Sequence, residues 1–361
     1  MNLAVISLGG KSSNRIAEEA KKYFKHAEVI DIRKLEIDAD TKGLEILYMG
    51  QPLKHFDCVY IRGSYKYVLL QRALARSFMH DSYTPICPEG FFLGHNKFLT
   101  MLELQRNGVR IPKTYFAATT PTAKAIIENR VNFPILIKIP YGTQGKGVMF
   151  ADSIGSAHSI LDALEVFKQP YLIQEYIEAG ASDIRAVVIG KKVIGYKRKA
   201  ANKNELRANI HLGGYGVPIE LHPDTVQVAL KSAKAVGADI CAVDILEGHK
   251  PAVIEVNLSP GLEGISKTTK LNVADMFAKF LYEKTIEYKN NLSKNEVGKA
   301  IKVVDLGKGK EILTSIEVKN GSIRLPKFIT DLSGFSLDDE VQIDVCKGKI
   351  SIKEHKISKP D

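Results

Sequence analysis

Two carboxylates and an amide near residue 250 have the types and spacing of a metal-binding surface. Glu255 and Asn257 stand two residues apart in an apolar run, so on a β-strand both point to the same face. Asp244 lies inside a second apolar segment, and a short polar loop joins the two segments into a predicted hairpin. The three side chains can then converge, and hard oxygen donors of this kind bind Mg²⁺ together with phosphate oxygens. A hairpin face exposed to solvent carries the same residue types, so this stretch alone leaves both interpretations open.

The rest of that strand predicts an apolar face and a sharp end. Ile254, Val256 and Leu258 alternate with the polar residues, and we expect them to point to the opposite face of the strand. The sequence Ser-Pro-Gly at 259–261 then stops the strand, because proline fixes one φ angle and glycine tolerates a positive one. The chain is therefore expected to turn away directly beside the predicted metal surface.

A lysine and a glycine-rich turn form a candidate phosphate site. Lys138 is the one charged residue in the apolar strand predicted over 135–139, and a half-buried lysine usually has an anion to meet. The turn at 142–147 can lay backbone N–H groups over phosphate oxygens, although a plain glycine hairpin has the same composition. A second strand is predicted at 148–151. A Walker A loop would lead into a helix instead, so this segment is a different motif.

Two arginines lie on the two strands of another predicted hairpin, 183–200, whose turn is at 190–191. We expect Arg185 and Arg198 at equal offsets from that turn, and hence near each other across it. Such a pair can face a phosphoryl group or a carboxylate. Either arginine alone can equally form an ion pair on the face of the strand.

Length and composition restrict the classes of protein. With 361 residues the chain is too long for one ordinary core, so we expect two or three domains. The net charge of +10 favours an anionic partner such as a nucleotide, an acidic peptide tail or RNA. No apolar run reaches the length of about 18 residues that predicts a membrane span. The 4 scattered cysteines lack metal-binding spacing and fit a reducing, cytoplasmic setting.

The predicted elements divide the chain into an N-terminal, a central and a C-terminal part. The first 95 residues alternate strand and helix, which indicates a small parallel sheet. Its strands are predicted at 3–8, 28–32 and 58–61. After a last helix at 273–287, the polar segment 289–299 indicates a linker. Residues 300–361 then form a separate, small β-rich domain.

Five segments, in their order and spacing, resemble the RimK-type branch of the ATP-grasp ligases, the alpha-L-glutamate ligase family. They are ILIKIPYGTQGKGV, LIQEYIEAGASDIRAVVIG, RANIHLGG, VDIL and IEVNLSPGLEGI. The resemblance covers about residues 1–287. It implies an α/β and α+β fold, with a Rossmann-like pre-ATP-grasp domain at 1–95 and an ATP-grasp domain of two subdomains at 96–288.

The resemblance also implies roles for individual residues. Lys97 and Lys138 would hold ATP phosphates, and Asp183 would hold the ribose. Arg185 and Arg198 would act in catalysis, facing the transferred phosphoryl group or the acceptor carboxylate. The other implied positions are the adenine-reading segment Gln174, Glu175, Tyr176 and Ile177, the triphosphate border Arg207, Ala208 and Asn209, and the metal ligands Asp244, Glu255 and Asn257.

The implied activity joins a carboxylate to an amine through an acyl phosphate, with ATP and Mg²⁺, for which Mn²⁺ can substitute. Such chemistry needs positioned cations and metal ligands rather than a covalent nucleophile, which fits this set of residue types. The implied partners are L-glutamate or another amino acid, and an acceptor carboxylate on a protein tail, a cofactor or a carrier protein. The family loop often reads RSNLHRGG, whereas Ala208 and Leu212 stand here. A basic group near the acceptor is thus missing, which makes an acidic protein tail less favoured.

Residues 320–354 resemble the AbrB/MazE-type swapped-hairpin fold, on the motif GSIRLPK and a final two-strand hairpin. Such domains dimerise by exchanging strands, and many bind DNA. Residues 300–361 contain 11 Lys or Arg and 10 Asp or Glu, so net charge gives little attraction to DNA. We therefore expect a module for homo-oligomer formation or substrate docking, with a DNA-binding regulatory protein as the alternative.

Overall fold

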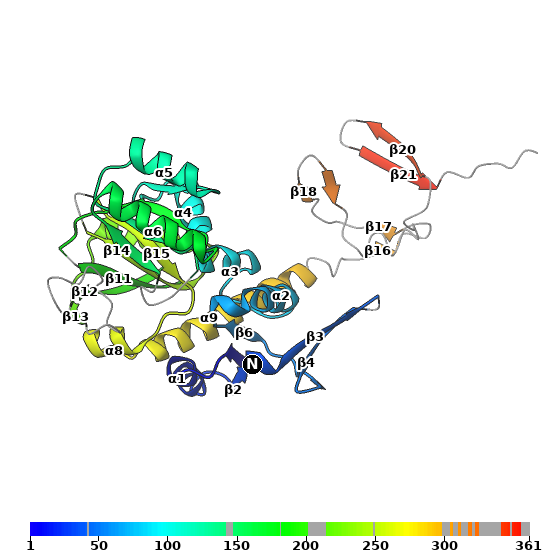
Figure 1. The fold of residues 1–361 in the computed structure, drawn as a ribbon. Helices are drawn as coiled ribbons and strands as arrows, with labels where there is room; N and C mark the ends of the chain where they lie inside the picture. The colour runs from blue at the N-terminus through cyan, green and yellow to red at the C-terminus, as the bar shows by residue number, and fades with distance from the viewer. Residues whose placement is uncertain are drawn as a thin grey trace, which may run out of the picture. The chain divides into compact units, whose positions relative to one another are not determined.

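The chain forms two compact units, Met1–Lys289 and Asn290–Asp361 (Figure 1). The structure is a computed structural model that describes residues 1–41, 43–141, 147–180, 182–200, 214–247, 250–297, 304–305, 310–311, 317–319, 322–324, 341–346 and 349–354. Within these residues, no helix is both long enough and apolar enough to cross a membrane. The division of the first unit at residue 95 stays a prediction.

The N-terminal part is the parallel sheet that the strand and helix alternation predicts. Its central strand β1 (Asn2–Ser7) pairs in parallel with β2 (His26–Asp31) on one side and with β6 (Cys58–Ile61) on the other. Helix α1 (Lys11–Ala20) buries Ile16, Ala17 and Ala20, which recur at helical spacing. Helix α2 (Val68–Phe78) follows β6. The carboxyl ends of β1 and β6 therefore lie at the same edge of the sheet.

Several short elements around this sheet are absent from the prediction. An antiparallel sheet is formed by β3 (Leu35–Asp40), β4 (Gly43–Tyr48) and β5 (Gln51–Pro52). Helix α3 (Pro88–His95) begins at a proline and leads directly to α4 (Lys97–Arg106).

The helix predicted near 96–107 is confirmed by α4. Asn96 caps this helix, because its side chain accepts from the backbone N–H groups of Phe98 and Leu99.

A four-stranded antiparallel sheet with its own hydrophobic core carries Lys138. The strand order is β7–β10–β8–β9, with bounds Thr114–Phe116, Leu172–Glu175, Ile135–Lys138 and Val148–Ala151. Helices α5 (Thr120–Asn129) and α6 (Ile154–Val166) pack with it around Ile127, Ile137 and Leu161. This core is a separate cluster from the one that fills the rest of the first unit.

A five-stranded antiparallel sheet carries the predicted metal ligands. The strand order is β13–β12–β11–β14–β15, with bounds Tyr215–Pro218, Lys192–Lys199, Ser182–Ile189, Ile240–Leu246 and Ala252–Asn257. Helix α7 (Pro223–Ala235) packs on β11 and β14, and helix α8 (Glu263–Thr269) packs on β12 and β13. Side chains of this sheet and of the N-terminal sheet belong to one contiguous core. The two sheets thus form one packed body.

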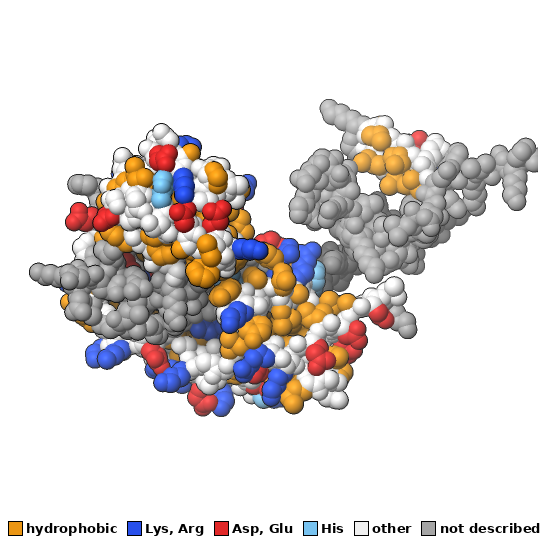
Figure 2. Space-filling model, viewed as in Figure 1, with side chains coloured by type: hydrophobic (Ala, Val, Ile, Leu, Met, Phe, Trp, Pro, Cys, Tyr) orange, Lys and Arg blue, Asp and Glu red, His pale blue; other side chains and the backbone are white. Residues whose placement is uncertain are grey.

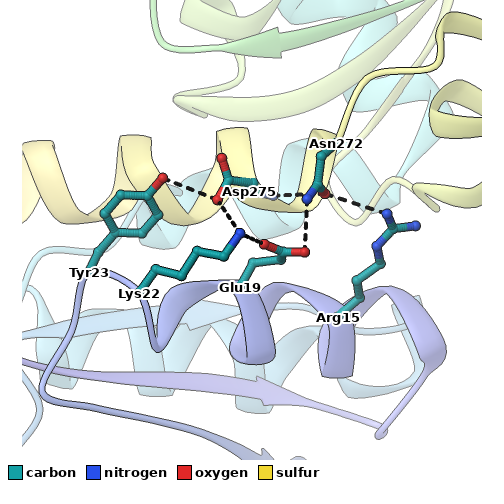
Figure 3. Close-up of polar contacts among 6 residues, drawn as sticks. All are labelled: Arg15, Glu19, Lys22, Tyr23, Asn272 and Asp275. Atoms are coloured by element: carbon teal, nitrogen blue, oxygen red, sulfur yellow. Dashed lines mark hydrogen bonds and ion pairs between the residues drawn. The ribbon is translucent and has the colours of Figure 1, made fainter.

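The long helix α9 (Val273–Val297) runs beside α1, and polar contacts join the two helices (Figure 3). Asn272, at its start, donates to Glu19 at 2.8 Å, and Asp275 accepts from Lys22 and from the hydroxyl of Tyr23, each at 3.1 Å. The helix extends ten residues past its predicted end at 287. Most of the segment predicted as a linker, 289–299, is therefore helical, because no glycine or proline interrupts it before residue 298.

In the part of the second unit that the structure describes, six short strands form antiparallel pairs. They are β16 (Val304–Asp305), β17 (Lys310–Glu311), β18 (Glu317–Lys319), β19 (Ser322–Arg324), β20 (Val341–Cys346) and β21 (Lys349–Glu354). Strands β20 and β21 pair in register along their whole length, which places Ile343 opposite Ile352 and Val345 opposite Ile350. The likeness to AbrB-type domains stays a prediction.

Candidate active site

One row of the five-stranded sheet brings the predicted metal and catalytic side chains together. Across neighbouring strands, Tyr196 stands opposite Arg185, Arg185 opposite Asp244, and Asp244 opposite Glu255. Residues directly opposite each other in a sheet point to the same face. Asn257, two residues beyond Glu255, lies on that face as well. The prediction that the three metal ligands share a face is confirmed.

A β-bulge corrects one detail of the predicted strand. The register between β14 and β15 shifts after Asp244, so that Ile245 pairs with Val253 and Ile254 has no partner. Val253 and Val256 are buried, whereas Ile254 is only half-buried, so the regular alternation predicted for Ile254, Val256 and Leu258 is interrupted at Ile254. The extra residue rotates the strand locally, as bulges beside functional sites commonly do.

Asp244 is the centre of a buried network of two arginines and two carboxylates. Arg185 donates to it in a bidentate pair, Nε to Oδ1 at 2.8 Å and Nη2 to Oδ2 at 2.7 Å. Arg198 reaches the same carboxylate, Nη2 to Oδ2 at 2.7 Å, and holds Asp183 at 2.6 Å and 2.8 Å. The predicted pairing of the two arginines across the hairpin is wrong, because Arg198 stands opposite Asp183 and Arg185 stands opposite Tyr196. The two arginines meet through Asp244 instead.

Burial and charge act against each other on these carboxylates. Burial alone raises the pKa of Asp244, but the guanidinium groups of Arg185 and Arg198 outweigh it and hold this pKa well below its usual range. Burial raises the pKa of Asp183, and the neighbouring charge of Asp244 adds to this, while Arg198 opposes it. Asp244 is therefore the carboxylate that stays ionised, which a metal ligand requires.

Lys138, on β8 of the four-stranded sheet, is a buried cation near Glu255. Its side chain is 7 % exposed, and its ammonium group donates to Oε1 of Gln174. Burial lowers its pKa to about 8; Glu255 is close enough to oppose the shift, and Lys97 is close enough to add to it. Two ammonium groups and the carboxylate of Glu255 are therefore near one another. Like charges that approach in this way attract a multivalent anion such as a triphosphate.

Lys97 is fixed at the start of α4 by contacts with the strand that carries Lys138. Its backbone N–H donates to the carbonyl of Pro140 at 3.1 Å. The preceding Asn96 donates from its side chain to the hydroxyl of Tyr141 at 3.1 Å, and Tyr141 stacks on Tyr65 with ring centroids 6.1 Å apart. Asn96, Tyr65 and Tyr141 are absent from the predicted site. The position of Tyr141, directly before the glycine-rich turn, is the signal that points to it.

The predicted adenine segment runs out of strand β10. Gln174 is buried and donates to Oγ1 of Thr114 at 2.8 Å, and the backbone N–H of Glu175 donates to the carbonyl of Lys113 at 2.9 Å. Tyr176 and Ile177 follow beyond the strand, half-buried. Tyr176 packs edge-on against Phe150 with ring centroids 5.6 Å apart. The segment that would read adenine is thus anchored at its first residues by hydrogen bonds and at Tyr176 by the contact with Phe150.

The oxygen donors fit a divalent cation that also binds phosphate. A carboxylate offers about four acceptor sites, and Asp244 uses three of them, so Oδ1 retains one. Oδ1 of Asn257 accepts one bond, from the N–H of Ser259 at 2.9 Å, and Glu255 makes no hydrogen bond or ion pair with another described side chain. No group of three His, Cys, Asp or Glu in the described residues can hold a metal ion alone. Phosphate oxygens would complete such a site.

Three predicted positions lie outside the described residues, namely Arg207, Ala208 and Asn209, and so does most of the glycine-rich turn. Asp183, predicted at the ribose, is bound to Arg198 in this structure.

Arg62 is a further residue that the sequence analysis did not name. It contacts the turn after Asn257, where it donates to the carbonyl of Pro260 at 2.8 Å. A charged residue directly after a buried strand of a parallel sheet is the signal that points to Arg62.

The four-stranded sheet that carries Lys138 and the five-stranded sheet that carries the arginines and the predicted metal ligands have the arrangement of strands found in the class of the ATP-grasp enzymes. Two family models match the chain: the RimK PreATP-grasp domain over residues 1–85 and the RimK-like ATP-grasp domain over residues 94–281. The chain belongs to the RimK-like ATP-grasp family and is an ATP-dependent ligase. Ligases of this fold use ATP and Mg²⁺.

Related sequences carry a more specific name. The chain is 35% identical over 286 residues to a protein of Halorhodospira halophila named "Probable alpha-L-glutamate ligase", which covers 78% of this chain and 95% of the relative. A protein of Marinomonas sp. with the same name is 34% identical over 290 residues, covering 79% and 96%. In both, the match leaves out about a fifth of this chain.

Solved structures share the fold at low sequence identity. A RimK domain ATP-grasp protein from Sphaerobacter thermophilus has a TM-score of 0.60 at 18% identity, covering 78% of this chain and 99% of that chain. The ATP-grasp ligase PsnB, solved with a minimal precursor, Mg and ADP, has a TM-score of 0.60 at 16% identity, covering 79% and 98%. D-cycloserine synthetase DcsG has a TM-score of 0.58 at 15% identity, covering 79% and 100%.

Proposed function

We propose that this ligase adds L-glutamate to the carboxyl end of an acceptor, through an acyl phosphate. The observation that carries the proposal is the single sheet face on which Arg185, Arg198, Asp244, Glu255 and Asn257 lie together, with Lys138 close to Glu255. The name of the relatives at 35% and 34% identity supports glutamate as the added amino acid. The acceptor is a protein tail, a cofactor or a carrier protein.

The chain's own residues account for the demands of this reaction. An acceptor carboxylate oxygen bonds to the γ-phosphorus of ATP as ADP leaves, and the amine nitrogen of glutamate then bonds to the carbonyl carbon as phosphate leaves. Lys97 and Lys138 hold phosphate oxygens, and Arg185 and Arg198 neutralise the charge that develops on the transferred phosphoryl group and the carbonyl oxygen. Bound Mg²⁺, or Mn²⁺ in its place, would be held by Asp244, Glu255 and Asn257 and would neutralise β- and γ-phosphate oxygens.

Mass spectrometry identifies the added amino acid and the acceptor. A cell extract is incubated with the protein, ATP, Mg²⁺ and isotope-labelled glutamate, and parallel samples contain labelled lysine or ornithine. We expect a component of the extract to gain the mass of one or more labelled glutamate residues only when ATP is present. If a component gains the mass of labelled lysine or ornithine instead, the ligase adds that amino acid and not glutamate. No labelled product and no ADP formation with any of the three would refute the ligase activity proposed here.

We also propose that the C-terminal unit joins two copies of the chain. Strands β20 and β21 present an apolar face, with Val345 73 %, Ile343 55 % and Ile350 48 % exposed (Figure 2). A two-stranded hairpin is marginal alone, and an apolar face of this kind is stabilised when a second copy covers it. Val345→Asp should then convert a dimer to a monomer in light scattering, whereas Lys353→Asp on the opposite face should not. A wild-type monomer would contradict the proposal.

A further inference from the structure

Arg62 is a buried cation without an acidic partner among the described residues. It follows β6 directly, at the carboxyl edge of the N-terminal sheet, and is 4 % exposed. Its guanidinium donates to three neutral oxygens: Oγ of Ser13 at 3.1 Å, the hydroxyl of Tyr60 at 2.9 Å and the carbonyl of Pro260 at 2.8 Å. Burying a guanidinium costs free energy. We therefore expect the hydrogen bonds of Arg62 to have a role, namely to fix the positions of the oxygens that accept them.

Among the described residues, three hydrogen bonds join the N-terminal part to the 259–262 turn, which follows β15. The contact between Arg62 and Pro260 is one of them. The backbone N–H of Gly63 donates to Oγ of Ser259 at 3.0 Å. The backbone N–H of Leu262 donates to Oγ of Ser12 at 3.0 Å. The turn is therefore held from the carboxyl ends of both β1 and β6, although almost 200 residues separate it from Arg62 in the sequence.

The same turn orients Asn257. The backbone N–H of Ser259 donates to Oδ1 of Asn257 at 2.9 Å, which fixes the rotation of that amide and the direction of its remaining lone pair. Arg62 binds the carbonyl of the residue after Ser259, and Gly63 binds the side chain of Ser259 itself. A continuous path of hydrogen bonds thus leads from the N-terminal sheet to a proposed metal ligand. The common core of the two sheets makes this path rigid.

We propose that Arg62 is a positioning residue for the metal site: it fixes the 259–262 turn and, through Ser259, aims Oδ1 of Asn257 at the cation. The proposal rests on the proposed role of Asn257 as a metal ligand. Under this proposal the pre-ATP-grasp domain contributes to metal binding through Arg62, although none of the motifs that predict metal or phosphate binding lies in that domain. Outer partners of this kind typically change metal affinity by about 10–100-fold when removed.

The test measures metal binding without turnover. Mn²⁺ is titrated into the full-length protein with the unreactive nucleotide AMPPNP, and the signal of unbound Mn²⁺ is read by electron paramagnetic resonance. We compare Arg62→Lys, which keeps the charge but loses the planar fork, with Arg33→Lys, whose exposed side chain pairs with Asp31. Ile30→Val trims the core at β2, the far edge of the same sheet, and controls for general destabilisation.

The proposal predicts that Arg62→Lys weakens Mn²⁺ binding about tenfold, while Arg33→Lys and Ile30→Val leave it unchanged. Ser259→Ala removes the Gly63 contact and should weaken binding in the same direction by a smaller factor; it serves if Arg62→Lys does not fold. Unchanged Mn²⁺ affinity in a folded Arg62→Lys or Ser259→Ala protein would overturn the proposal, and so would equal losses in Arg62→Lys and Ile30→Val. If the wild type does not bind Mn²⁺ with AMPPNP at all, the proposed function itself fails.

Discussion

Asp244 offers the sharpest prediction, because it has a structural and a proposed metal-binding role at once. Asp244→Asn keeps the shape but removes the charge that faces Arg185 and Arg198. The asparagine amide also turns N–H donors toward a guanidinium, where only acceptors fit. The carboxylate is 3 % exposed, and the side chains of Arg185 and Arg198 are 17% and 6% exposed, so water replaces little of what is lost. Among the described residues, Asp183 is the acidic side chain that still pairs with Arg198.

The expected loss of stability is large for a single substitution. Removal of one member of a buried ion pair typically costs about 3–5 kcal/mol, because an uncompensated charge stays buried. A domain of about 150–250 residues loses roughly 2–4 °C of melting temperature per kcal/mol. The melting temperature of the first unit should therefore fall by about 6–20 °C.

Differential scanning calorimetry without nucleotide measures this loss, with two matched controls. Asp224→Asn on the surface of α7 replaces an exposed carboxylate, and Glu255→Gln replaces the neighbouring proposed ligand, which has no described ion pair. Both should melt within a few degrees of the wild type.

The stability that Asp244 contributes should also depend on pH. Because the arginines lower the pKa of Asp244, its contribution to the free energy of unfolding is present above the ordinary carboxyl pKa of about 4 and is lost as the pH falls below it. The gap between wild type and Asp244→Asn should close in acid.

A melting temperature of Asp244→Asn equal to that of Asp224→Asn at pH 7 would refute this reasoning. It would mean that the arginines find other partners without cost, and that the network is not a preformed part of the site. A loss that persists unchanged at acid pH would contradict the electrostatic explanation in favour of a packing effect.

Further predictions concern Lys138 and Gly94. Since burial lowers the pKa of Lys138 to about 8, its ammonium group loses its charge above that pH, and kcat/KM for ATP should fall about tenfold per pH unit there. Lys138→Arg, which stays charged, should remove this fall; a wild-type profile that is flat to pH 10 would contradict the assignment. A Cβ atom at Gly94 would lie 2.5 Å from Cγ of Leu258, so Gly94→Ala should cost about 1–3 kcal/mol in urea unfolding, whereas Gly155→Ala, which meets open space, should cost nothing of that kind.

Local periodicity made much of the sheet that carries the site predictable. Glu255 and Asn257 share a face because strand side chains alternate, and the loop after Asp244 is short enough to force a hairpin. The same alternation is present in β3, where residues 35–40 alternate apolar and polar, so β3 was predictable from its sequence. In β4 the apolar run Ile46, Leu47 and Tyr48 breaks the alternation, so this rule does not predict that strand.

Other features depend on contacts that no local pattern contains. The bulge at Ile254 has only a weak local signal: Ala252, Val253 and Ile254 are three apolar residues in a row, and alternation begins only at Glu255. The register of the hairpin that carries Arg185 and Arg198, in contrast, follows from the turn predicted at 190–191. Counting outward from that turn pairs Arg185 with Tyr196 and Arg198 with Asp183, so the expected equal offsets are a miscount. The contacts of Arg62 with the 259–262 turn join distant parts of the chain, so only the folded structure reveals them.

The proposed activity requires that the face carrying Asp244, Glu255 and Asn257 binds a nucleotide through a divalent metal. Calorimetric titration of the wild type with AMPPNP, with and without Mg²⁺, tests it most directly. Glu255→Gln and the matched Glu247→Gln, whose exposed carboxylate pairs with Lys197, are titrated in parallel. We predict Mg²⁺-dependent binding that Glu255→Gln loses and Glu247→Gln keeps. Binding that is independent of Mg²⁺, or identical in Glu255→Gln and the wild type, would contradict the claim.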